Sequence, residues 1–280
     1  MRGMFSEYKN QVGFKRVYMF SFQLLLLSFL TFLSNGCGAN DQGSQKESIH
    51  EKSEQPGEQQ VNKEKVPGIV LLNIGDYDRE YIGTLVHMVD SCKPAAIIIN
   101  VLFKQPKEGV GDAVLCKALR ESKVDFLVSN KDKKGNVYRS APKFDTLATA
   151  VGLPYPDEID GVATHFTPFK KVNSIIQKHI AIEVIEKIRP GIKWKYAVDE
   201  SVPIKYTKAL PDIENYKIMD LDPEYFDNSY QGKIVILTYL GPALDNVYYT
   251  PLRKGKEYGN IPDTYGGVVL ANIFGTIFGN

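Results

Sequence analysis

The chain has 280 residues, of which 43% are hydrophobic and 24% are charged, a composition typical of a soluble globular domain with an additional segment. Its formal net charge is +1, so no field of the whole chain would attract nucleic acid or steer a strongly charged partner. Composition and charge therefore exclude a basic nucleic-acid-binding protein and leave the ligand open.

Residues 1–36 have the pattern of an export signal, because basic residues are followed by an apolar run over residues 17–33 and then by small residues. A small residue before Cys37, with a glycine after it, resembles the cleavage site of a bacterial lipoprotein. We therefore expect Cys37 to carry lipid in the cell envelope, outside the cytoplasm. An uncleaved membrane anchor is the alternative, although the apolar run is at the short limit of a bilayer span.

Residues 37–66 are predicted to form a disordered tether, since they are mostly Gln, Glu, Lys, Ser and Asn and cannot bury enough apolar surface to offset their ordering entropy. A flexible coil of this length would hold the following domain on the order of 30 Å from the membrane. The globular domain is then expected to cover residues 67–280.

Three continuously apolar runs open this domain, at residues 69–74, 95–101 and 124–128. Such runs predict strands buried on both faces. The two intervening segments have helical periodicity, and Asp78 begins the first of them while Gly111 and Asp112 cap the second. Strands that alternate with helices predict an α/β fold with a mostly parallel, doubly wound central sheet and helices on both faces.

Residues 130–170 are predicted to form an irregular insertion over the sheet edge, with a strand at 161–169. A helix is expected to begin at Asn173 and to end before Pro190. A short strand at 201–206 and a brief helix starting at Asp222 complete this part.

The closing segment combines a strand, a loop and a buried helix. Residues 234–237 predict a central strand, and the loop after it carries Asp245 and Thr250. Two glycines then open an apolar helix whose only strongly polar residue is Asn272.

Enzyme and cofactor signatures are absent. The sequence contains no Gly-x-Ser-x-Gly elbow, no His-Glu-x-x-His, no phosphate loop and no cysteine cluster for zinc. His87, His165 and His179 fall on separate elements, and His50 lies in the tether. His87 and His179 fall in predicted helices, where a solvent-facing or hydrogen-bonded role is expected rather than metal ligation. We expect no catalysis and no cofactor.

Cys92 and Cys116 remain once Cys37 is assigned to lipid. They fall in or beside the first two predicted helices. Export permits a disulfide between them, and buried thiols are the alternative that we favour, because the spacing alone specifies no geometry.

Asp76 and Asp245 each follow a predicted central strand, so both could face the crevice at the carboxyl ends of the strands, where open α/β sheets bind ligands. We expect a ligand to enter at the mouth formed by Asp76, Asp245 and Thr250, rather than on the insertion. Asp245 could instead hold a turn. Asn272 completes the candidate ligand-binding set, with a bond to a loop carbonyl as its alternative role. The residues do not specify a metal.

The order and spacing of several segments point to one family. These segments are residues 69–76, 95–103, Asp112 with 118–119, 157–169, 232–237, Asp245, 250–251, 267–268 and 271–272. Together they resemble the type 2 CHASE domain, an extracytoplasmic sensor family of bacteria, over residues 67–278. The sequence departs from the family at two places. Gly75-Asp76 stands where the family has an Asp-Asp or Ile-Asp pair after the first strand, and Asn100 stands where the second strand usually has an acid.

The resemblance implies a membrane-tethered sensory domain that binds an unknown small ligand. In this family an intracellular kinase or cyclase usually follows, and none follows in this sequence, so we expect a separate membrane kinase or cyclase as partner. An envelope metal-dependent hydrolase using Asp76 and Asp245 is one alternative, and a structural interaction protein is another.

Overall fold

The computed structural model describes residues 66–107, 109–131, 136–217, 229–242, 246–252, 262 and 264–279. All of them belong to residues 63–280, the second of two compact units in the chain. The predicted export signal, Cys37, nearly all of the predicted tether, the helix start at Asp222, and Asp245 lie outside the described residues.

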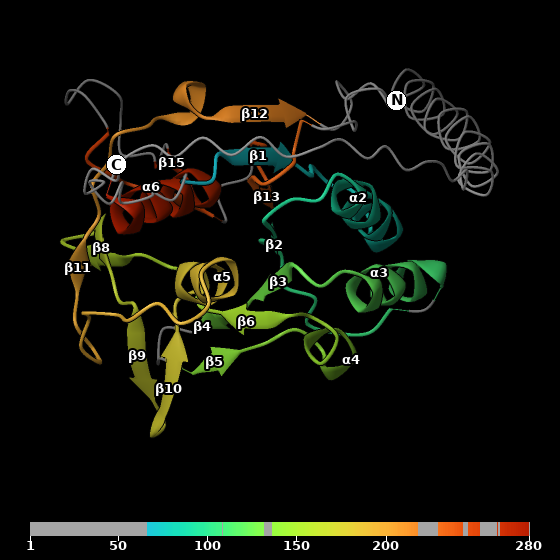
Figure 1. The fold of residues 1–280 in the computed structure, drawn as a ribbon, viewed down its shortest axis with the longest axis horizontal. Helices are drawn as coiled ribbons and strands as arrows, with labels where there is room; N and C mark the ends of the chain where they lie inside the picture. Colours follow the sequence, from blue (N-terminus) through green and yellow to red (C-terminus); the bar gives the residue numbers. More distant parts are fainter. Residues whose placement is uncertain are drawn as a thin grey trace, which may run out of the picture. The chain divides into compact units, whose positions relative to one another are not determined.

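A six-stranded sheet forms the centre of this unit (Figure 1), and every pair of neighbouring strands in it is parallel. Across the sheet the strands are β12 (Glu214–Lys217), β1 (Ile69–Asn73), β13 (Ile234–Thr238), β2 (Ala96–Ile99), β3 (Asp125–Val128) and β6 (Ala150–Gly152). The predicted α/β fold with a parallel sheet is confirmed. The predicted central position of the closing strand is confirmed as well, because β13 pairs with both β1 and β2.

Helices cover both faces of the sheet, as a doubly wound fold requires (Figure 1). They are α2 (Arg79–Ser91), α3 (Val110–Glu121), α4 (Pro142–Asp145), α5 (Ile180–Ile188) and α6 (Gly266–Phe278). Alternate strand residues enter opposite cores, so that Leu72 packs with α2, α3 and α4 while Leu71 packs with α5 and α6. The central strands β1, β13 and β2 are therefore apolar at nearly every position.

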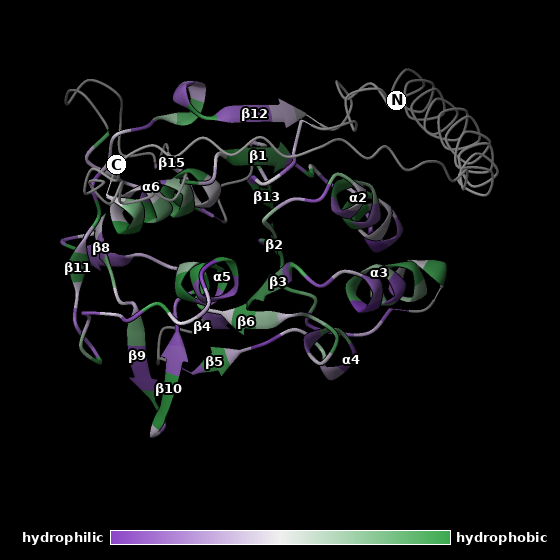
Figure 2. Ribbon diagram, viewed as in Figure 1, coloured by the Kyte–Doolittle hydropathy of each residue, from purple (hydrophilic) through white to green (hydrophobic). Residues whose placement is uncertain are grey.

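Helix α6 is hydrophobic around most of its surface, as Figure 2 shows, and residues 266–274 are all buried. A helix of this kind must be covered on more than one side. The sheet covers one side, and the segment around Ile204 and Ile213 packs in the same core. None of the helices in the described ranges is long and apolar enough to cross a bilayer.

Smaller elements connect these layers. They are β4 (Asn130–Lys131), β5 (Val137–Tyr138), β7 (Asp157–Ile159), β8 (Val162–Phe166), β9 (Phe169–Val172), β10 (Ile175–Lys178), β11 (Val202–Pro203), the 3-10 helix Leu210–Asp212, β14 (Val247–Tyr248) and β15 (Thr264–Tyr265). Strands β11, β8 and β7 form one small sheet, and β9 pairs with β10. The predicted insertion thus contains strand β6 of the main sheet together with small antiparallel sheets.

Two predicted helix starts were wrong. The helix expected from Asn173 begins at Ile180, because Asn173 and Ser174 have φ of 48° and 66° and form the turn of the β9–β10 hairpin. The second helix is capped at Gly109, and Asp112 lies inside its first turn, where it bonds to other elements. The prediction for Asp78 was right, since its carboxylate accepts a hydrogen bond from the Tyr81 amide at the N-terminus of α2.

Candidate functional site

Polar side chains meet at the carboxyl ends of the three central strands. The side-chain Nδ2 of Asn100 donates to Thr238 Oγ1 at 3.2 Å, and Thr238 is fully buried. Asn73 Oδ1 accepts from the backbone amides of Gly75 and Leu240, at 3.0 and 2.9 Å. These contacts hold the loops after β1 and β13 at one edge of the sheet, where ligand sites of open α/β sheets form.

Helix α6 starts at the same edge. A Cβ atom on Gly267 would lie 2.6 Å from Thr238 Cγ2, so only glycine permits this approach of the helix to the end of β13. The first amides of a helix have no partner within the helix and are able to bond an acceptor outside it. Gly267 is therefore explained by packing against the end of β13, whereas a Cβ on Gly266 would meet the side chain of Asn246.

The structure places two of the four predicted ligand-binding residues at or near this edge. Asp76 is exposed in the turn that follows β1. Thr250 is buried, and its hydroxyl lies 2.8 Å from the hydroxyl of Thr264. Asp245 lies outside the described residues. Because the position of Asp245 is not described, a shared site of Asp76 and Asp245 stays a prediction.

Asn272 has a structural role in the described chain. Its Oδ1 accepts from the amides of Thr207 and Lys208, and its Nδ2 donates to the carbonyls of Lys208 and Val268. These bonds attach the segment before β12 to helix α6. The bond to the Lys208 carbonyl is the alternative role predicted for Asn272, a bond to a loop carbonyl. Both polar atoms of Asn272 are thereby occupied.

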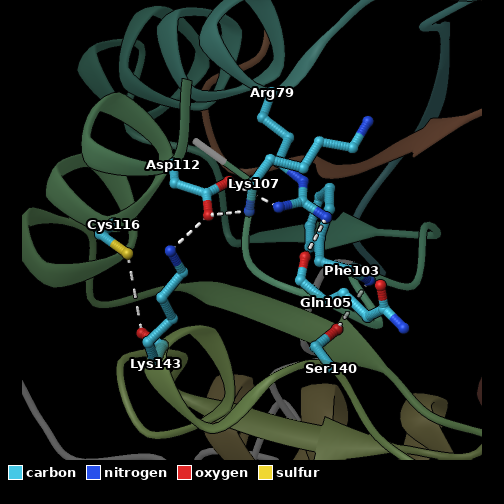
Figure 3. A network of polar contacts seen from close by, with 8 residues as sticks. All are labelled: Arg79, Phe103, Gln105, Lys107, Asp112, Cys116, Ser140 and Lys143. Carbon is cyan, nitrogen blue, oxygen red and sulfur yellow. Dashed lines mark hydrogen bonds and ion pairs between the residues drawn. The ribbon is translucent and has the colours of Figure 1, made fainter. Parts of the chain in front are cut away.

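An ionic network, shown in Figure 3, joins the first turns of three helices on the α2–α3 face. Asp112 of α3 is buried and bonds Arg79 Nη1 of α2 at 2.5 Å. Its other oxygen pairs with Lys143 of α4 and accepts from the Lys107 amide at 2.8 Å. Arg79 also donates to the Gln105 carbonyl at 2.7 Å, so the network fixes the loop that follows β2.

Arg79 contacts a pair of aromatic rings that also contact each other, with its guanidinium carbon 5.4 Å from the Phe103 ring centre and 5.2 Å from that of Phe144. Burial favours the neutral form of Asp112, but the bonds from Lys143, Arg79 and the Lys107 amide outweigh it and hold the pKa of Asp112 well below its usual range. Sequence reasoning missed this network because its members are far apart in the chain. The only local signal was an acid in the first turn of a helix.

Histidines and cysteines do not form a reactive cluster in the described ranges. No group of three or more His, Cys, Asp or Glu side chains there is arranged to hold a metal ion. His87 is exposed on α2, and His179 is buried at the start of α5. Cys92 and Cys116 are both thiols, as we favoured, and Cys92 is buried.

A comparison of the chain with models of protein families identifies its family. A family model described as the CHASE2 domain matches residues 53–280. The chain belongs to the CHASE2 family. CHASE2 domains are extracytoplasmic sensory domains and not an enzyme family, and the α/β fold of this chain is compatible with that family. Searches of curated proteins and of solved structures found no match.

The CHASE2 assignment agrees with the resemblance seen in the segments that carry the central strands and helix α6. Those same segments build the carboxyl edge described above, where the Asn100 that replaces a usual acid now bonds Thr238. Membership of the family therefore indicates a sensory domain. The structure shows that polar side chains and loops converge at the carboxyl edge of its sheet.

Proposed function

We propose that this CHASE2 protein is a membrane-tethered envelope sensor without catalysis of its own. It binds a small ligand at the carboxyl edge of the sheet, at the mouth formed by Asp76, Asp245 and Thr250. It acts through a separate membrane partner such as a kinase or cyclase. Family membership supports the sensory role. The convergence of Asn73, Asn100 and Thr238 at the end of the strands, together with the exposed Asp76 in the turn after β1, is the observation that favours this edge.

The charge of the edge sets the class of ligand that we expect. Asp76 is exposed and would present a carboxylate to a ligand, while the first amide of α6, that of Gly266, already donates to the Asn246 carbonyl. A cation or a small molecule with a basic group fits the carboxylates of Asp76 and Asp245. In this proposal the ligand changes how the loops after β1 and β13 are held, and the partner detects the changed surface.

Thermal unfolding in the presence of envelope metabolites and divalent ions tests the site. We expect a ligand that raises the melting temperature of the wild type to lose its effect on Asp76→Asn and Asp245→Asn, whereas both empty variants melt close to the wild type. Glu121→Gln is the matched control, because Glu121 is an exposed acid in the last turn of α3, at the amino end of β3 and not at this edge. Equal shifts in all four proteins with every ligand that binds would remove these acids from the site.

A further inference from the structure

A second polar site lies at the carboxyl end of β6, where helix α5 begins. His179 caps α5, and its backbone amide donates to the Pro168 carbonyl at 2.8 Å. Strand β6 and helix α5 are in close contact, since a Cβ on Gly152 would lie 2.7 Å from the Ile180 Cα. Beside His179 is a small cavity of about 10 Å³. Its lining residues are Leu153, Tyr155, Asp157, Thr167, Lys170 and His179.

The hydrogen bonds of His179 determine which of its ring nitrogens carries the proton. Nδ1 lies 3.2 Å from the Ala181 backbone nitrogen and accepts its hydrogen bond, so Nδ1 has no proton. Burial lowers the pKa of His179 to about 3, so the ring is neutral near pH 7. A neutral imidazole has one proton, and here that proton must be on Nε2.

Nε2 is therefore a hydrogen-bond donor, and it has no partner among the described residues. His179 is only 1% exposed, so bulk water does not reach the ring freely. A buried donor is expected to have an acceptor, because leaving it unpaired costs its full desolvation. The cavity has room for about one water molecule or one hydroxyl group, which could supply that acceptor.

Asp157 gives the cavity an acceptor as well. Its Oδ2 accepts from the Thr167 hydroxyl at 2.6 Å, and its Oδ1 is 3.8 Å from Lys170 Nζ. That second distance is too long for a hydrogen bond, so Oδ1 keeps the capacity to accept one. A hydroxyl group can accept from His179 Nε2 and donate to Asp157 at once. A carboxylate cannot donate, and an ammonium group cannot accept.

We propose that this pocket binds one hydroxyl group of a small alcohol, such as a polyol or sugar, with the rest of the ligand against Tyr155 and Lys170. Leu153 and the Tyr155 ring give the pocket an apolar wall for the carbon skeleton. The pocket shares no residue with the mouth at Asp76, so this inference and the proposed function succeed or fail separately.

Nitrogen NMR of the full chain labelled with ¹⁵N at histidine tests the pocket directly. The Nε2 resonance of His179 is expected to show a bound proton in the absence of ligand. D-glucose and glycerol are expected to shift it in a saturable way, while His87 and His165 serve as internal references. Sodium acetate and 1,2-dimethoxyethane, which accept hydrogen bonds but do not donate them, are expected to give no saturable shift.

Two variants separate binding from folding. His179→Asn keeps a preferred capping residue for the Ala181 amide and removes the pocket donor. Asp157→Asn keeps an acceptor for Thr167 and places a donor where the pocket needs an acceptor. In calorimetric titration with D-glucose or glycerol, each variant is expected to bind at least tenfold more weakly than the wild type, whereas Glu158→Gln binds normally.

Three results would overturn the inference. A proton on Nδ1 of His179 would remove the donor. An equal saturable shift with acetate would make the pocket an anion site. The absence of saturation with either hydroxyl compound would mean that the donor is solvated by water alone.

Discussion

Three buried titratable residues show how differently the same fold treats ionisable groups. Asp112 keeps its charge because Arg79 and Lys143 bond both of its oxygens. His179 stays neutral because burial disfavours the charged form of its ring and lowers its pKa. Asp125, at the start of β3, is fully buried, and its Oδ2 has no hydrogen-bond partner in the described ranges. Burial depth alone therefore does not decide the charge of a residue in this domain.

Asp125 gives a pH dependence with a defined sign. Burial raises the pKa of Asp125 from 3.8 to about 7, and the negative charge of Asp90 adds to this rise. The folded state therefore holds a proton between about pH 4 and pH 7 that the unfolded state releases. The contribution of this residue to the free energy of unfolding is fully present below about pH 4. It is lost as the pH rises to about 7, and the loss is on the order of 4 kcal/mol.

We predict that Asp125→Asn removes this loss. Relative to the wild type, the variant should gain unfolding free energy on the order of 4 kcal/mol between pH 4 and pH 8, because asparagine has no proton to release. Urea unfolding at a series of pH values measures the difference. Asp76→Asn, at an exposed position, should follow the wild type throughout. Parallel profiles for Asp125→Asn and the wild type would show that Asp125 is ionised in the folded protein.

Close helix packing determines the geometry of the α2–α3 layer. Figure 1 shows the two helices side by side on one face of the sheet. They approach closely at Gly83, where a Cβ would lie 2.8 Å from both the Cα and the nitrogen of Leu115. The same approach places Arg79 of α2 beside Asp112 of α3. The ionic network therefore depends on a glycine one turn away in sequence.

Gly83→Ala is predicted to destabilise the domain by about 2 kcal/mol, because the new methyl group meets backbone atoms that cannot move without shifting a helix. Gly275→Ala is the matched control in α6, since a Cβ there has nothing within 4 Å. That change should stabilise by about 0.5–1 kcal/mol through the better helix propensity of alanine. Chemical unfolding of both variants tests the pair, and a neutral Gly83→Ala would show that α2 and α3 separate easily.

The described unit is an α/β domain of the sensory CHASE2 family. Its attachment to the membrane is our proposal. The family assignment places the domain outside the cytoplasm, and residues 1–36 have the pattern of an export signal. The sequence between that pattern and the domain is polar and is suited to a flexible tether. Attachment through Cys37 would keep the sensory edge within reach of a membrane partner.

Cys37→Ala is predicted to abolish incorporation of radiolabelled palmitate and to leave the precursor uncleaved, because in our proposal the lipid attaches to that thiol. Cys92→Ala is the control, since Cys92 is a buried thiol of the folded domain, and this variant should be labelled normally. Membrane fractions from cells fed with the labelled fatty acid give the measurement. Labelling of Cys37→Ala, or no labelling of the wild type, would favour an uncleaved membrane anchor.

The sequence alone determined the class of the fold, because a strand buried on both faces is apolar at every position. Residues 69–72 and 234–237 show this directly, and the parallel direction of the strands was inferred from the helices between successive apolar runs. The two edge strands of the sheet were not predicted, because they lack a continuous apolar run. Glu214–Lys217 is polar because an edge strand is half solvated, and Ala150–Gly152 is too short to give a pattern.

Only the tertiary structure decided which polar residues meet. Asp112 and Arg79 are 33 positions apart, and Asn272 and Thr207 are 65 apart. Nothing in the local sequence around His179 indicates that it lines a cavity together with Asp157. Side-chain periodicity reports burial within one element, whereas a site is built from contacts between elements. Those contacts depend on how the chain folds back on itself, and the local sequence does not encode that path residue by residue.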